Sequence, residues 1–159
     1  MQLGMMQKAD GDTMKKILFV CTGNTCRSPM AEGIFNDICK KDSLPFVGES
    51  AGLSTITGLP VSANSVSVLK EKGIDISCLT STAITDVNME DYILFAVMTK
   101  EHSDVLCYYG VPSEKIYILR EDKGGVFDPY GGSHALYRVC RDEIEEAVKK
   151  LTEELREKI

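Results

Sequence analysis

Apolar and polar positions alternate along the chain in a way that predicts strands and helices in turn. Four short, mainly apolar runs predict buried strands, at residues 17–20, 46–51, 92–98 and 116–119. Apolar residues spaced three or four apart predict helices at residues 29–40, 62–72, 100–109 and 133–157, with a short one at 85–90. This order indicates an α/β fold of three layers, in which helices cover both faces of a four-stranded parallel sheet. Ligands of such sheets bind at the carboxyl ends of the strands.

The ends of several helices carry their own signals. Ser28-Pro29 suits an N-cap followed by the first helical position, and Gly73 suits the position after a helix end. Three cysteines lie on apolar helical faces and are expected to pack there: Cys39, Cys107 and Cys140. In the last helix one stripe is expected to face the core: Tyr137, Cys140, Ile144, Ala147, Val148, Leu151 and Leu155.

Length and composition favour one soluble domain. The chain has 159 residues, of which 43% are hydrophobic and 26% charged, and its formal net charge is −6. That charge argues against nucleic acid or an anionic membrane as the main partner, and no apolar run reaches the ~20 residues of a membrane span. We expect a single domain over residues 14–159. Residues 1–13 are expected to be a disordered leader or an expression remnant.

The chemistry is concentrated between the first strand and the first helix. Cys21 ends the strand and Arg27 follows six positions later, with Gly23 between them. In so short a loop the backbone N–H groups converge, and together with the helix dipole they favour an anion. A bound phosphate would meet a thiol on one side and a planar guanidinium on the other. The spacing therefore predicts a phosphatase site with Cys21 as nucleophile.

Simpler explanations exist for each of these residues. A buried structural cysteine is the usual fate of an isolated Cys, and Cys21 and Cys26 could bind zinc. No second pair with zinc-site spacing accompanies them, however, and the strand, the glycine and the following helix all favour catalysis. In that interpretation Arg27 and the loop amides hold the phosphate oxygens, and the Ser28 hydroxyl donates to the sulfur.

A phosphatase also needs a proton donor for its leaving group. Asp128-Pro129 lies in residues 123–133, a loop with four glycines between the last strand and the last helix. Asp and Pro are also common turn residues, so the loop alone does not decide between an acid and a turn. His102 and His134 are the two histidines, and neither belongs to a catalytic motif, so neither receives a role.

Residues Val20 to Glu32 resemble the signature of the low-molecular-weight protein tyrosine phosphatases, and the resemblance extends from about Lys15 to the C-terminus. It implies that Asp128 is the general acid and that Ser50, in Ser50-Ala51-Gly52, bonds Asn24 to support the loop. Phosphorylated proteins are then the substrates, and a cytoplasmic monomer without cofactor or metal is expected. The resemblance also implies a set of phosphate- or substrate-binding residues: Thr22, Gly23, Asn24, Thr25, Cys26, Ser28 and Tyr130.

Two features concern the state of the loop. Residues 73–77 follow the family pattern, but Cys78 stands where many members have histidine. If that histidine supports the loop, part of the support is absent from this chain. The family also implies a reversible disulfide between Cys21 and Cys26 that protects the nucleophile from over-oxidation. A thiolate enzyme of this kind needs a reducing compartment.

Thr25 is the loop residue that indicates which phosphorylated side chain is the substrate. In members specific for phosphotyrosine a bulky aliphatic residue usually precedes the second cysteine, whereas threonine resembles the bacterial protein-arginine phosphatases. A small polar side chain suits a guanidinium, although Tyr130 also suits phosphotyrosine. We therefore predict a phosphoarginine phosphatase, with a phosphotyrosine phosphatase as the alternative. Arsenate reductases of this fold carry a further cysteine pair just after the central strand, where this chain has Met98-Thr99, so that activity is not favoured. A non-catalytic phosphoanion-binding module would have no use for Asp128.

Overall fold

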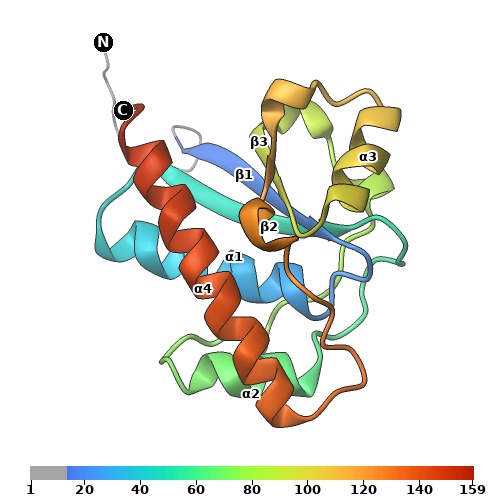
Figure 1. The fold of residues 1–159 in the computed structure, drawn as a ribbon, viewed down its shortest axis with the longest axis vertical. Helices are drawn as coiled ribbons and strands as arrows, with labels where there is room; N and C mark the ends of the chain where they lie inside the picture. The colour runs from blue at the N-terminus through green and yellow to red at the C-terminus, as the bar shows by residue number, and fades with distance from the viewer. Residues whose placement is uncertain (1–13) are drawn as a thin grey trace.

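A parallel sheet with strand order β2-β1-β3-β4 forms the centre of the computed structural model, which describes residues 14–159 (Figure 1). The predicted α/β class and the four parallel strands are confirmed. The prediction for residues 1–13 lies outside the described residues. The strands are β1 (Lys15–Cys21), β2 (Phe46–Gly52), β3 (Tyr92–Val97) and β4 (Ile116–Ile118).

Helices cover both faces of the sheet, as predicted. Helices α1, α2 and α4 pack together on one face, and α3 lies on the other (Figure 1). The short helix expected at residues 85–90 is instead a pair of 3-10 turns, at residues 84–86 and 89–91. The four α-helices are α1 (Arg27–Lys41), α2 (Ala63–Lys70), α3 (Lys100–Tyr108) and α4 (His134–Arg156).

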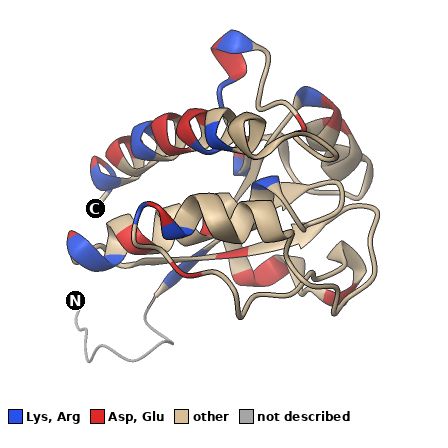
Figure 2. Cartoon of the chain, turned by 90° about the horizontal axis from the view of Figure 1, so that it is seen from below, with Lys and Arg blue, Asp and Glu red and all other residues tan. Residues whose placement is uncertain are grey.

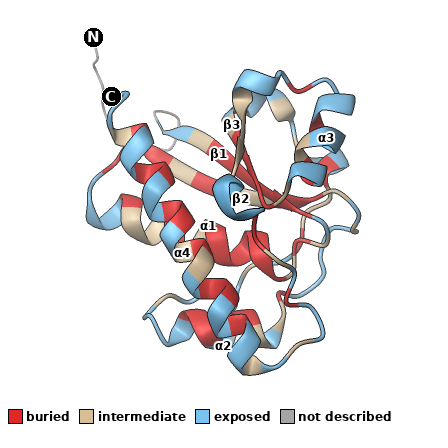
Figure 3. Ribbon diagram, in the orientation of Figure 1, coloured by how far each residue is buried: buried red, intermediate tan, exposed pale blue. Residues whose placement is uncertain are grey.

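The central strand β1 divides the core into two parts. Ile17, Phe19 and Cys21 face the layer of α1 and α4, and Leu18 and Val20 face the α3 layer, because side chains alternate along a strand. All five are buried. Buried residues gather along the strands in the middle of the molecule (Figure 3). Cys21 is thus held at the carboxyl end of a fully buried strand. The predicted stripe of α4 is buried as well.

The predictions for Ser28, Gly73 and the helical cysteines had different outcomes in the structure. Ser28 does not cap α1, because the helix begins at Arg27 and the Ser28 hydroxyl is bonded elsewhere, as described below. Gly73, at φ +78°, occupies the left-handed conformation that a chain turning away after a helix requires. Cys39 and Cys140 are buried, but the expectation for Cys107 was wrong: it is exposed, on the outward side of the short helix α3.

The outer face of α4 carries lysines and arginines interleaved with acidic residues (Figure 2). Several pair with neighbouring elements, as Arg138 does with Glu71 after α2. Within residues 14–159, none of the helices has both the length and the apolar character that crossing a membrane requires.

Candidate active site

The segment from Cys21 to Arg27, here called the cradle loop, joins β1 to α1 at the carboxyl edge of the sheet. Its outer carbonyls are held by the chain after β2: Leu53 N–H donates to Cys21 O and Ser54 N–H to Thr22 O, both at 2.9 Å. Other backbone N–H groups of the loop have no hydrogen-bond partner among the described residues. These are the amides of Thr22, Gly23, Thr25 and Cys26. Free amides beside a helix N-terminus form an anion site.

The Cys21 thiol lies at the base of this loop. It is 2% exposed, its Sγ is 2.9 Å from Ser28 Oγ, and the backbone N–H of Asn24 donates to it at 3.3 Å. Two hydrogen-bonding groups therefore point at the sulfur from within the loop and the first turn of α1.

Asn24 holds the loop in shape. Its φ of +57° is in the left-handed region, which is unfavourable for a residue with a side chain. The side chain compensates with three hydrogen bonds: Oδ1 accepts from Thr82 N–H at 2.7 Å, and Nδ2 donates to Ser28 Oγ at 2.7 Å and to Ser50 Oγ at 3.0 Å. The contact of Ser50 with Asn24 that the resemblance implied is present.

These bonds also decide which way each hydroxyl donates. Both serines receive a hydrogen from Asn24, so each has its own proton free for another acceptor. Ser50 donates to Glu32 Oε1 at 2.6 Å, and Ser28 has Cys21 Sγ as its acceptor. The network therefore runs from Asn24 outward in two directions and ends on the sulfur at one side and on Glu32 at the other.

Glu32 was not singled out by the sequence. Burial beneath the loop is the main cause that raises the pKa of its carboxyl from 4.5 to about 7. The Ser50 hydrogen bond lowers that pKa and nearby Glu49 raises it. A glutamate beside the apolar face of an amphipathic helix was the available signal.

Cys78 is exposed, and Thr82 N–H occupies Asn24 Oδ1, so the support of Asn24 does not depend on a side chain at position 78.

Arg27 and Asp128 meet at the mouth of the cradle loop. The Arg27 guanidinium is buried, donates from Nη1 to Val126 O at 3.1 Å and lies with Nη2 3.7 Å from Asp128 Oδ2. Asp128 comes from the loop of residues 123–133, and its carboxylate is 53% exposed. Its Oδ1 accepts from Tyr130 N–H at 3.1 Å, which holds the carboxylate in a turn. The Asp128 carboxylate therefore stands at the mouth of the cradle loop and remains accessible to solvent.

A cavity of about 200 Å³ collects most of the predicted residues, and Ser28 and Ser50 lie beneath it in the network. Thr25 is half-buried in its wall, with Oγ1 3.9 Å from Cys26 Sγ. The ring of Tyr130 is 79% exposed at the rim. The cavity is lined by Cys21, Thr22, Gly23, Asn24, Thr25, Cys26, Arg27, Asp128 and Tyr130.

Cys26 is buried, and its Sγ is 3.2 Å from the Tyr137 hydroxyl of α4. Cys21 and Cys26 are both free thiols in this structure. The disulfide between them stays a prediction. Within the described part of the chain, no group of three or more histidine, cysteine, aspartate or glutamate side chains is arranged to hold a metal ion.

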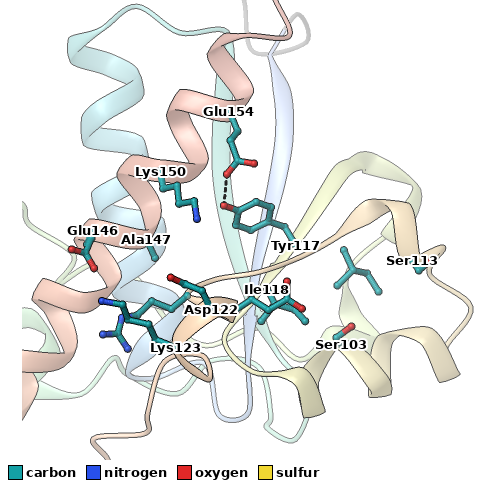
Figure 4. A pocket seen from close by; sticks show the side chains of 13 residues that line it. Ser103, Ser113, Tyr117, Ile118, Asp122, Lys123, Glu146, Ala147, Lys150 and Glu154 are labelled. Atoms are coloured by element: carbon teal, nitrogen blue, oxygen red, sulfur yellow. Dashed lines mark hydrogen bonds between the residues drawn. The ribbon is translucent and has the colours of Figure 1, made fainter.

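A larger cavity, of about 670 Å³, lies away from the cradle loop (Figure 4). It opens beside β4 and is lined by charged residues of both signs, including Asp122, Lys123 and Lys150, and by the Tyr117–Glu154 hydrogen bond of 2.6 Å. No cysteine or histidine lines it. The smaller cavity carries the reactive groups and is the candidate active site.

Comparison with known proteins agrees with this geometry. The family profile described as low molecular weight phosphotyrosine protein phosphatase matches residues 16–159. The protein-arginine-phosphatase of Bacillus subtilis is 37% identical over 88% of this chain and 96% of its own length. The low molecular weight protein-tyrosine-phosphatase PtpB of Staphylococcus haemolyticus is 34% identical over 86% and 96%. A solved YwlE arginine phosphatase mutant with a phosphorylated active-site serine superimposes with a TM-score of 0.82, at 36% identity, covering 89% of this chain and 95% of that one.

Proposed function

The chain belongs to the low molecular weight phosphotyrosine protein phosphatase family, and from that premise we propose that it hydrolyses phosphoarginine in proteins through a phosphocysteine intermediate on Cys21. The observation that carries the proposal is a single cavity that holds a hydrogen-bonded thiol, a buried guanidinium and an accessible carboxylate. These are the nucleophile, the anion clamp and the acid that phosphoryl transfer to a cysteine requires.

In the first step the Cys21 thiolate attacks phosphorus, so that an S–P bond forms while the P–N bond to the substrate guanidine breaks. Asp128 gives its proton to the leaving nitrogen. The phosphoryl oxygens lie against the free loop amides and Arg27, which oppose the charge of the transition state.

In the second step water attacks the phosphocysteine and Asp128 takes the proton of that water. The S–P bond breaks, and the electron pair returns to sulfur. Ser28 supports this step, because its hydroxyl proton is directed at Sγ by the bond that it receives from Asn24. The solved relative with a phosphorylated active-site serine supports a covalent phosphoenzyme at this position.

The choice of phosphoarginine rests on Thr25 and on the Bacillus relative named above. Thr25 lines the cavity and presents a hydroxyl where a bulky aliphatic side chain would pack on a phenyl ring. A planar, polar guanidinium fits beside a hydroxyl, and Asp128 can both pair with it and protonate it. Phosphotyrosine is the second candidate, because the exposed ring of Tyr130 and the PtpB relatives favour it.

The test compares kcat/KM for matched peptides that carry phosphoarginine or phosphotyrosine at one position. Wild type is expected to prefer phosphoarginine. Thr25→Ile is expected to move the ratio of the two kcat/KM values towards phosphotyrosine by about 10–200-fold, which is what one methylene-sized change in a pocket contributes. Thr25→Val removes the hydroxyl without the added bulk, and so separates the two causes.

Two results would contradict the assignment. A wild-type preference for phosphotyrosine would replace it with the tyrosine phosphatase. Failure to release phosphate steadily from either peptide and from p-nitrophenyl phosphate would leave only phosphoanion binding. Because the proposed nucleophile is a free cysteine, we place the activity in a reducing compartment, and the cytoplasm meets that need.

A further inference from the structure

His102 lies at the same edge of the sheet as the cradle loop. It belongs to the first turn of α3, where its backbone N–H donates to Oγ1 of the capping residue Thr99 at 3.2 Å. Strands β1 and β3 are neighbours, so the segments that follow them lie side by side. This topology brings a histidine eighty positions along the chain to the residue that follows Cys21.

The contact is a hydrogen bond between the His102 ring and the side chain of Thr22. Nε2 of the imidazole is 2.9 Å from Thr22 Oγ1, and His102 is 7% exposed. On its other side Thr22 is held through its carbonyl, which accepts from Ser54 N–H at 2.9 Å. The side chain of Thr22 is thus fixed. Its N–H shares a peptide plane with the carbonyl of Cys21, which accepts from Leu53 N–H at 2.9 Å, so this amide points away from Leu53 and has no hydrogen-bond partner among the described residues.

The surroundings keep the imidazole neutral. Burial and the nearby Arg27 guanidinium lower the pKa of His102 to about 4, although Glu101 of α3 and Asp128 oppose this. At neutral pH the ring therefore has one donor and one acceptor nitrogen. Its Nδ1 is buried and has no hydrogen-bond partner among residues 14–159. A buried nitrogen without a hydrogen-bond partner lowers stability, and an apolar side chain would fill the same space without that cost. Filling space is therefore not enough to account for a histidine here.

We propose that His102 is a positioning residue, which holds Thr22 and thereby orients the first backbone amide after the nucleophile towards the phosphate. The proposal rests on the phosphatase function proposed above, but it does not depend on whether the substrate is phosphoarginine or phosphotyrosine. His102 does not line the active-site cavity, and it acts through Thr22.

A double-mutant cycle tests the contact, with p-nitrophenyl phosphate as substrate and vanadate as a probe of the cradle. His102→Leu removes the ring nitrogen and Thr22→Val removes the hydroxyl with little change of shape. Each is expected to lower kcat/KM and vanadate affinity by about 3–10-fold, the contribution of one neutral hydrogen bond. The double variant is expected to be no weaker than either single one.

His102→Gln places an amide nitrogen near the position of Nε2 and is expected to recover most of the vanadate affinity. The control is His134→Leu, which removes the other histidine and its 2.9 Å bond to Ser67 but leaves the cradle loop untouched. It is expected to match wild type in vanadate affinity. Circular dichroism verifies that each variant is folded. If His102→Leu does not fold, Thr22→Val and His102→Gln are enough to test the contact.

The proposal is overturned if the losses of the two single variants multiply in the double one, or if vanadate binds equally well without the His102 nitrogen. It is also overturned if glutamine and leucine at position 102 behave alike. These outcomes differ from failure of the phosphatase function itself, in which wild type would not hydrolyse p-nitrophenyl phosphate at all.

Discussion

Replacing Glu32 by glutamine is expected to change how the stability of the protein depends on pH. The carboxyl is partly buried under the cradle loop, where it accepts a hydrogen bond from the Ser50 hydroxyl at 2.6 Å. Glutamine keeps an oxygen for that hydrogen bond and removes the ionisation. The change therefore isolates the charge of Glu32 from its contact.

The sign follows from the pKa of Glu32, which is about 7 in the native protein against an ordinary value of 4.5. The native state binds this proton more tightly than the unfolded chain, so the free energy of unfolding falls as the pH rises from 4.5 to 7. A difference of about 2.5 pH units, at 1.36 kcal/mol each, is a loss of roughly 3 kcal/mol when the carboxyl is fully ionised. Glu32→Gln lacks this loss.

The assay is urea unfolding of both proteins at a series of pH values from 4.5 to 8. Other titrating groups are common to the two proteins and largely cancel in the difference, so the variant should gain up to roughly 3 kcal/mol over wild type across this window. Asp37→Asn, which removes a surface carboxylate paired with Lys41 on the same helix, is the control and should show a change below about 0.5 kcal/mol.

A difference between wild type and Glu32→Gln that stays constant from pH 4.5 to 8 would refute the reasoning, because it would mean that Glu32 titrates alike in the native and unfolded states. A difference that grows as the pH falls would mean that the native state lowers the pKa of Glu32 instead of raising it. Activity gives a second readout. With the acceptor oxygen kept, kcat/KM for p-nitrophenyl phosphate at pH 7 should stay within about threefold of wild type, since hydrogen bonds of this kind contribute about 1 kcal/mol.

The remaining predictions concern the chemistry itself. Cys21→Ser should abolish turnover and still bind vanadate, as measured by calorimetry, and a tenth of wild-type activity would disprove covalent catalysis. Asp128→Ala should slow aryl phosphates with poor leaving groups by about 10²–10⁴-fold and activated ones far less, so equal losses across a leaving-group series would remove Asp128 from the acid role. Arg27→Lys should lower kcat/KM by roughly 100-fold or more, because an ammonium group cannot reproduce the two-pronged contact of a guanidinium, and near-normal kinetics would contradict that.

The proximity of Cys21 and Arg27 was predictable because the two residues are close together in sequence. A strand, a loop of a few residues and a helix place Cys21 and Arg27 around one point whatever the rest of the chain does. Asp128 was ambiguous by itself, since an Asp-Pro pair in a glycine-rich loop is also an ordinary turn. In the structure Asp128 does both. Its Oδ1 accepts from the Tyr130 N–H in a turn, and its Oδ2 lies 3.7 Å from Arg27 Nη2 at the cavity.

Ser28 shows where local rules were insufficient. Serine before proline is a good helix N-cap, and the prediction used that preference. In the structure its hydroxyl bonds Cys21 and Asn24 instead, and α1 starts at Arg27, two residues before the predicted Pro29, without a side-chain cap. A hydroxyl can satisfy only a few partners, and here contacts within the loop took precedence over the helix end.

By itself the sequence determined the order of elements, the parallel sheet and the loop between Cys21 and Arg27, because hydrophobic periodicity and short-range spacing depend on residues close together in the chain. The supports of that loop were decided by tertiary structure alone. Thr82 comes from the connection before β3 and His102 from α3, and they reach the loop only because the order β2-β1-β3 sets their segments beside the end of β1. Burial there alters the protonation of Glu32 and His102, and no local pattern in the chain specifies which polar side chains will lose contact with water.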